Sequence, residues 1–135
     1  MKFWTIALCL LAACASAHAA TTVWQPAAGN RQIPIWPGAA PALQPVPGTE
    51  TATVSDKLLA GKPVTAVTHV TRPTMTVYAP TGRNTGAAVV VIPGGGFEIL
   101  AIDLEGTEAC DWLASNGITC VLLKYRVPSR PYDWK

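Results

Sequence analysis

Apolar and polar residues alternate through two stretches in the middle of the chain, VTAVTHVT (64–71) and TMTVYA (74–79). Period-two alternation predicts half-buried β-strands. The next stretch, PTGRNTG (80–86), is rich in turn-forming residues and predicts a hairpin connection. The run AAVVVI (87–92) is apolar throughout, which is typical of a strand covered on both faces.

A helix and a second apolar strand are predicted after residue 100. Asp103 is the expected N-cap, with Glu105 and Glu108 in the first turn. Apolar and small residues then recur at helical spacing, namely Gly106, Ala109, Cys110, Trp112 and Leu113, before a C-cap at Asn116-Gly117. ITCVLLKY (118–125) follows as another continuously apolar strand. This order predicts a βαβ unit with parallel strands, and therefore the α/β class.

The preceding region, residues 20–63, contains most of the prolines. Proline lacks the N–H that helices and central strands need, so we expect an extended or looping lead-in. Trp24, Ile33, Ile35 and Trp36 predict that this lead-in packs on a surface.

The first residues, MKFWTIALCLLAACASAHAA, have the form of an export signal: Lys2, an apolar run, then small residues. We expect a signal peptide over 1–19, cleaved before Ala20, and a periplasmic or secreted protein. Leu11 to Cys14 also fits a lipobox, so the alternative is an outer-membrane lipoprotein that touches the membrane only through a lipidated Cys14.

The composition changes this picture little. The 135 residues are 50% hydrophobic and 13% charged, with a net charge of +2 and no basic run, which argues against disorder and against a nucleic-acid partner. After signal cleavage two cysteines remain, Cys110 and Cys120. An oxidising compartment permits a bridge, but packed helix and strand axes lie about 10 Å apart. We therefore expect two separate buried thiols.

The glycine triplet in VVVIPGGGFEIL (89–100) is the main candidate for chemistry. A dinucleotide fingerprint would need a small residue where Ile99 stands, and the Gly-Lys-Ser/Thr of a P-loop is absent. An oxyanion hole fits better, because glycines let backbone N–H groups face a cleft without a Cβ in the way. A plain turn between strand and helix is the alternative.

Several motifs together resemble the N-terminal part of bacterial α/β-hydrolases of the acetyl-xylan esterase and esterase/lipase type, some of them called xylanases. The motifs are Pro93 to Phe97, Glu105-Gly106, Trp112-Leu113, Gly117-Ile118, Tyr125-Arg126, and Ile35 to Gly38 with Arg72 to Thr74 in the lead-in. The resemblance implies that residues 64–135 begin such a domain. It implies an oxyanion loop at Gly94, Gly95 and Gly96, with Phe97 beside the substrate, a small ester or acetylated carbohydrate. Glu105 would either hold this loop or line the mouth of the substrate site. It implies no metal or cofactor.

Other residues have simpler interpretations. Asp103 with Glu105 is poor evidence for a glycosidase pair, Arg126 is expected in a structural ion pair, and Tyr125 and Trp112 are expected in the core.

The nucleophile of such an enzyme is missing from the sequence. The family places its serine in G-x-S-x-G, followed by an acid and then a histidine. None of Ser16, Ser55, Ser115 and Ser129 lies in that context, and His69 precedes the glycine loop. We therefore expect an N-terminal piece of an esterase that is inactive as it stands. The alternative is a non-catalytic exported or lipid-anchored protein that binds a partner through its lead-in.

Overall fold

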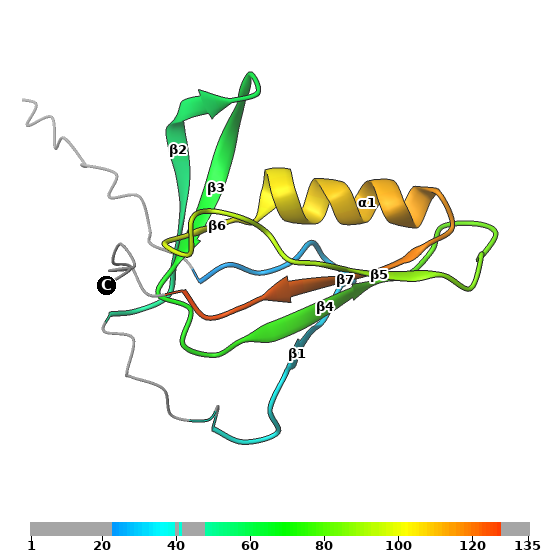
Figure 1. Cartoon of the computed structure of the whole chain (residues 1–135), viewed down its shortest axis with the longest axis horizontal. Coiled ribbons are helices and arrows are strands. Elements are labelled where there is room, and N and C mark those ends of the chain that lie inside the picture. Colours follow the sequence, from blue (N-terminus) through cyan, green and yellow to red (C-terminus); the bar gives the residue numbers. More distant parts are fainter. Residues whose placement is uncertain (1–22, 40, 42–47, 128–135) are drawn as a thin grey trace, which may run out of the picture.

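The computed structural model describes residues 23–39, 41 and 48–127, which form a mixed α/β structure with two small sheets and a covering helix (Figure 1). The expected signal peptide, both cleavage sites, Ser16 and Ser129 lie outside these residues. Within them, no helix is long and apolar enough to cross a membrane. The elements are β1 Gln32–Pro34, β2 Thr51–Leu59, β3 Lys62–Thr68, β4 Thr74–Tyr78, β5 Ala88–Val91, β6 Leu100–Ala101, η1 Asp103–Thr107, α1 Glu108–Ser115 and β7 Thr119–Lys124.

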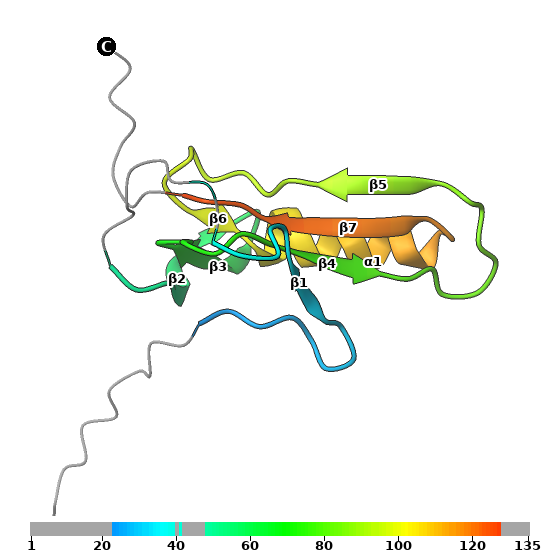
Figure 2. The same cartoon turned by 90° about the horizontal axis from the view of Figure 1, so that it is seen from below.

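The larger sheet has the strand order β1-β4-β7-β5 (Figure 2). Strands β5 and β7 are parallel and are connected through η1 and α1, so the predicted βαβ unit is confirmed. The predicted hairpin between 74–79 and 87–92 is wrong, because β7 lies between β4 and β5 and pairs with both. In this order β4 and β5 are two strand spacings apart, about 10 Å in total. The connection 79–87 is long enough to cover that distance.

The smaller sheet, β2-β3-β6, contains a hairpin that the proline content of the lead-in obscured. Residues 48–62 contain no proline, and this gap accommodates β2, which is an edge strand. Ala60 and Gly61 both have positive φ angles, 51° and 78°, as a tight hairpin turn requires. The hairpin projects beside α1 in Figure 1, where the Lys62 ammonium lies 2.7 Å from the Glu108 carboxylate.

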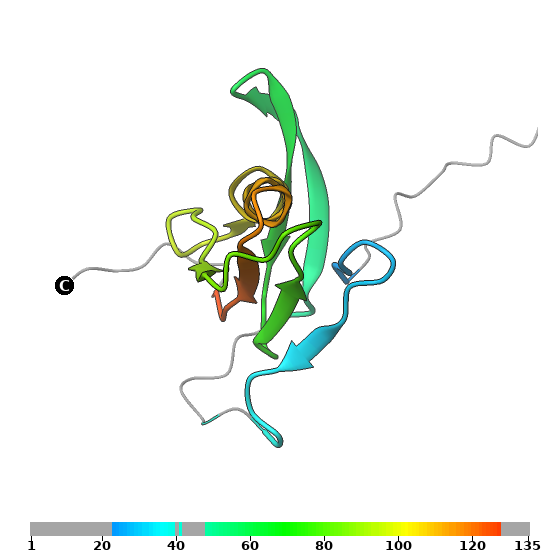
Figure 3. The same cartoon turned by 90° about the vertical axis from the view of Figure 1, so that its right-hand side faces the viewer.

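The core lies between α1 and one face of the larger sheet. Cys120 and Leu122 on β7 are fully buried, as are Cys110 on α1 and Ile102 before it. Tyr78 on β4 belongs to the same cluster, and Trp24 from the lead-in packs against it, as predicted. Figure 3 looks almost along α1 and shows the helix on this face only.

The opposite face of the sheet carries apolar side chains that no described element covers. Val90 and Ile92 are 59% and 61% exposed, and Val77 is 40% exposed. The prediction that 87–92 is covered on both faces is therefore wrong: β5 is an edge strand, and the run is apolar although one face is bare.

The predicted helix is confirmed, with corrections at its start. Its first turn, η1, is π-helical, and Asp103 is the first residue of that turn while Ile102 takes the cap position. The end is as expected, because Asn116 is the C-cap and Gly117 has φ +78°. Trp112 is 64% exposed, so its expected core position is wrong. It is two residues, about 200° of helical rotation, from the buried Cys110.

Cys110 and Cys120 form a disulfide, which corrects the expectation of two separate thiols. Their Cα atoms are 5.2 Å apart, well below the distance between helix and strand axes. The distance between the axes overestimates the distance between the cysteines. Cα atoms on the side of a helix that faces the sheet lie about 2.3 Å closer to the sheet than the helix axis does, and both cysteine side chains point into the same interface. The bridge joins α1 directly to β7.

Candidate functional site

The glycine loop leaves the carboxyl end of β5 and returns to the smaller sheet through β6. Pro93 is fully buried at its start. The Gly94 carbonyl accepts the N–H of Ala101 at 2.9 Å, and the Gly95 carbonyl accepts the N–H groups of Glu98 and Ile99, both at 3.2 Å. The loop is therefore a closed turn with defined geometry, located where ligands commonly bind in α/β sheets.

One of the three glycines, Gly95, is required by the backbone that packs against it. Gly95 has φ +139°, and a Cβ there would lie 2.3 Å from the Ile99 carbonyl oxygen. A Cβ on Gly94 would lie 2.5 Å from the Glu105 carboxylate, which is the movable end of a side chain, so a substitution there would displace Glu105 and not the backbone. Gly96, at φ +64°, would meet nothing within 4 Å, so only its backbone conformation favours glycine. Phe97 continues the left-handed backbone with φ +60°.

The backbone donors of the loop divide into used and unused groups. The Gly94 N–H donates to Oε2 of Glu105 at 2.9 Å, so it is occupied. Within the described part of the chain, the N–H groups of Gly95, Gly96 and Phe97 have no acceptor. Successive N–H groups in left-handed or turn backbone form a concavity that suits an anion. The expected donor set thus changes from Gly94–Gly96 to Gly95, Gly96 and Phe97.

Glu105 and Gly106 hold this loop against the helix start. Glu105 accepts the Gly94 N–H, which is the holding role that the resemblance implied. A Cβ on Gly106 would lie 3.0 Å from Leu122 and 3.2 Å from Pro93, so the missing side chain lets η1 pack closely on both. The Glu-Gly pair therefore works as one unit: the carboxylate anchors the loop and the glycine permits the approach.

Tyr125 is a positioning residue that the sequence did not reveal, since it was expected simply in the core. Its hydroxyl donates to the Pro93 carbonyl at 2.7 Å, and its ring meets the Phe97 ring edge-on, with centroids 6.4 Å apart. Burial, and after it the charge of Glu105, raises the pKa of Tyr125 above its ordinary value, so the hydroxyl stays a donor at neutral pH. Phe97 is itself exposed and forms the outer wall of the loop.

The two carboxylates near the helix start do not form a catalytic pair. Asp103 Oδ2 accepts the N–H of Thr65 on β3 at 2.7 Å, and Oδ1 accepts the N–H of Leu104 at 2.8 Å. Burial opposes ionisation of Asp103, but the hydrogen bonds from Thr65 and Leu104 prevail and lower its pKa. Asp103 and Glu105 thus each bind backbone N–H groups, and Asp103 links η1 to the smaller sheet.

Ser115 and His69 are each engaged locally and do not form a serine–histidine pair at the loop. Ser115 donates its hydroxyl to the Trp112 carbonyl at 2.7 Å. Nδ1 of His69 lies 2.9 Å from the Thr68 hydroxyl, and the His69 ring packs over Gly48. Across 23–39, 41 and 48–127, no three His, Cys, Asp or Glu side chains gather as metal ligands.

Within the described part of the chain, Arg126 does not form the structural ion pair expected for it. Among the described residues the ion pairs are Lys62–Glu108 and Lys124–Glu50. The Arg126 guanidinium instead donates weakly to the Pro41 carbonyl at 3.4 Å. The buried pair belongs to Lys124 two residues earlier, whose ammonium lies 2.5 Å from Glu50.

Comparison with known proteins finds a short similarity to an esterase. No family model matches the chain, and no solved structure matches it. An acetylxylan esterase from Xylanibacter ruminicola is 44% identical over 43 residues, which are 32% of this chain and 9% of that esterase. The chain therefore has a partial, distant similarity to an acetylxylan esterase and spans a small fraction of its length.

Proposed function

We propose that this chain carries the oxyanion-stabilising part of an exported serine hydrolase of carboxylesterase type with an α/β-hydrolase fold. The single observation that carries the proposal is the row of N–H groups at Gly95, Gly96 and Phe97, which lack acceptors among the described residues. Such donors stabilise the negative oxygen of a tetrahedral intermediate in ester hydrolysis.

The support comes from the way the loop is held. A preorganised donor set stabilises charge without reorganising during the reaction. Here Glu105 anchors Gly94, and the Tyr125 hydroxyl anchors Pro93, so both residues before the donors are fixed. The parallel strands β5 and β7 provide the rigid base.

The substrate class follows from the relative. The similarity to an acetylxylan esterase favours an acetyl ester on a plant polysaccharide over other small esters. No serine of the sequence lies in a G-x-S-x-G context, so we expect the chain alone not to turn over. We expect no hydrolysis of p-nitrophenyl acetate by residues 20–135 above a heat-killed control, and serine-inhibitor-sensitive activity would contradict the assignment.

A chimera tests the donors directly. Residues 88–126 would replace the corresponding strand, loop, helix and strand of an active acetylxylan esterase. Gly95→Pro would remove one N–H donor and would also distort the loop, because proline cannot adopt the φ of +139° found at Gly95. Loss of the donor alone costs about 2.7–4 kcal/mol, or roughly a hundred- to thousand-fold in kcat, so we expect a loss of at least that size. Trp112→Ala is the control, because it removes an exposed aromatic side chain of the same transferred segment, lies outside the loop and keeps every N–H. If kcat of the Gly95→Pro chimera were unchanged, the oxyanion assignment would be wrong and the glycines would serve only as a turn.

A second candidate is a non-catalytic exported or lipid-anchored binding protein. The observation that favours it is an open pocket of about 420 Å³ lined partly by the lead-in, through Pro34 and Trp36. Binding of a carbohydrate by the chain together with an inactive chimera would favour this candidate.

A further inference from the structure

A second hollow adjoins the pocket of about 420 Å³, and neither the motifs nor the glycine loop accounts for it. Its volume is about 450 Å³, within the range of small-molecule binding sites. Its wall includes the aromatic rings of Trp36 and Tyr125, two prolines, Pro41 and Pro73, and Arg126. Among the described residues that line it, Arg126 is the only charged one and the others are apolar or aromatic.

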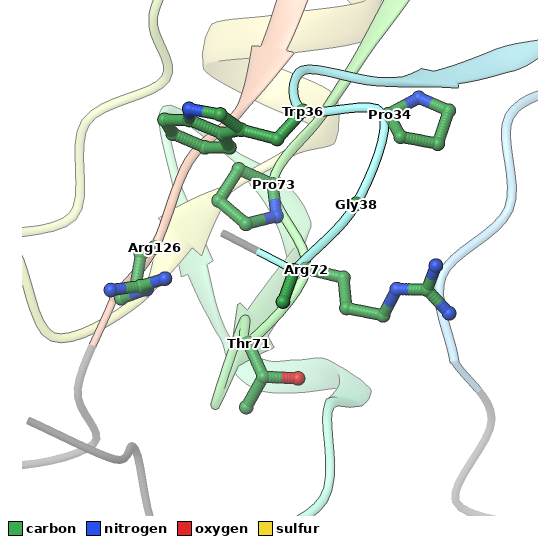
Figure 4. Close-up of a pocket in the computed structure, with 8 residues that line it drawn as sticks. Pro34, Trp36, Gly38, Thr71, Arg72, Pro73 and Arg126 are labelled. Atoms are coloured by element: carbon green, nitrogen blue, oxygen red, sulfur yellow. The ribbon is translucent and has the colours of Figure 1, made fainter. Parts of the chain in front are cut away.

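Three of these residues, Trp36, Pro73 and Arg126, line both the hollow and the adjoining pocket. Figure 4 shows the three together on one side of that pocket, whereas the Arg72 guanidinium extends to the opposite side. Arg72 lines the pocket but is not among the described residues that line the hollow. The charge at the hollow is therefore that of Arg126 alone.

The Arg126 guanidinium has donors to spare. Within the described part of the chain it makes one weak hydrogen bond, to the Pro41 carbonyl at 3.4 Å, and no ion pair. No Asp or Glu is found among the described residues that line the hollow or the adjoining pocket. Because Arg126 lines both spaces, it lies at the border between them. A guanidinium in this position is suited to bind a carboxylate.

The rest of the wall favours a flat ring. The Trp36 side chain is partly exposed and Pro73 is buried. The Tyr125 ring is held in place, because its hydroxyl donates to the Pro93 carbonyl at 2.7 Å and its ring meets that of Phe97 edge-on. Aromatic rings pair favourably with other rings in edge-to-face or offset-stacked arrangements. An aromatic ligand therefore gains more here than an aliphatic chain of similar size.

We propose that the hollow binds a small aromatic acid, a flat ring that carries a short carboxylate arm. The ring packs against Trp36 and Tyr125 inside the hollow, and the carboxylate accepts hydrogen bonds from Arg126 at its border. The occupant is a small molecule because the volume is that of a ligand-sized site. The site uses neither a nucleophile nor the N–H groups of the glycine loop, so it is independent of the proposed function.

The test is a calorimetric titration of the full chain with three probes: cinnamate, its neutral amide cinnamamide, and hexanoate, an acid without a ring. We expect cinnamate to bind at least about tenfold more tightly than either of the other two, with its advantage over the amide shrinking as salt is raised. Arg126→Gln should remove most of that advantage and leave the affinity for the amide unchanged. Trp36→Ala should weaken binding of cinnamate and cinnamamide alike.

Matched variants control for general effects of charge and of aromatic side chains. Arg72→Gln removes an arginine whose guanidinium extends away from the hollow, so it should change no affinity. Trp112→Ala removes an exposed indole on α1 and should likewise change none. Arg126→Lys keeps the charge but loses the planar fork, so we expect an intermediate affinity for cinnamate.

Three outcomes would overturn the proposal: equal affinity for cinnamate and cinnamamide, equal affinity for cinnamate and hexanoate, or an equal loss in Arg72→Gln and Arg126→Gln. The last would indicate a general attraction of anions. If Arg126→Gln fails to fold, magnetisation transfer in NMR between the cinnamate ring protons and the Trp36 indole of the unsubstituted chain decides, and its absence would overturn the site. Because binding requires no turnover, an inactive esterase chimera would reject the proposed function and leave this site standing.

Discussion

Gly95 and Gly96 are adjacent, yet the structure predicts very different costs for replacing each with alanine. Gly96→Ala meets no atom within 4 Å and places a non-glycine residue at φ +64°. A left-handed conformation costs an ordinary residue about 1–2 kcal/mol. We expect Gly96→Ala to lower the free energy of unfolding by that amount and to leave the loop in place.

Gly95→Ala carries two further costs. Its φ of +139° lies where essentially only glycine is found, which costs about 1–3 kcal/mol. Its Cβ would lie 2.3 Å from the Ile99 carbonyl oxygen, so the turn must open. Opening breaks the two hydrogen bonds that the Gly95 carbonyl accepts, from Glu98 and Ile99, at about 1 kcal/mol each. We expect a total of about 4 kcal/mol.

Urea unfolding followed by tryptophan fluorescence would compare the two variants. Hydrogen exchange would locate the effect, because the Ile99 amide should lose protection in Gly95→Ala and keep it in Gly96→Ala. Equal destabilisation of the two variants, or a protected Ile99 amide in Gly95→Ala, would refute the account of the loop as a glycine-dependent closed turn.

Three other features lead to measurable outcomes. Replacing Cys110 and Cys120 with alanine removes a cross-link between residues separated by 10 positions in the sequence. We expect this to lower the free energy of unfolding, measured in urea, by about 2.7 kcal/mol. An unchanged urea midpoint would contradict the bridge. The pKa of Asp103 is lowered below 3.8 in the folded state, so its stabilisation is complete above pH 3.8 and is lost as the pH falls through the folded value. Asp103→Asn should therefore reduce stability at neutral pH and flatten its fall in acid, and an equal loss at every pH would argue against this. Val90→Lys places a charge on the uncovered apolar face at the β5 edge, so we expect it to raise the monomer fraction in sedimentation. Val54→Lys is the control, because Val54 is about equally exposed on the β2–β3 hairpin. An equal effect of Val54→Lys would show that the added charge is responsible, whatever its position.

Local sequence determined the elements whose signals lie within a few residues. The strands at 88–91 and 119–124 follow from their apolar runs, and the helix end follows from Asn116-Gly117, because a cap depends only on adjacent backbone. The parallel βαβ unit followed from the order of these elements. The glycine loop was recognisable for the same reason, since Pro93 to Gly96 directly follow a strand.

Strand order was decided by tertiary structure. The turn-rich stretch 80–86 predicted a hairpin, but β7 pairs with both β4 and β5 and so occupies the place between them. Turn-forming residues indicate that the chain changes direction, but they do not indicate which strand the next strand will pair with. The proline-free gap at 48–62 was the signal for β2, and the surrounding prolines hid it.

At the candidate site, the sequence determined which residues are glycines, and the fold decided what their N–H groups do. Gly94 donates to a carboxylate eleven residues away, and Tyr125 reaches back thirty-two residues to Pro93. The Cys110–Cys120 bridge and the exposure of Trp112 likewise depend on how α1 and β7 are placed in space. Periodicity and caps are local properties of the backbone, whereas these contacts form only when packing brings distant residues within a few ångströms, and that step is decided by the whole tertiary structure.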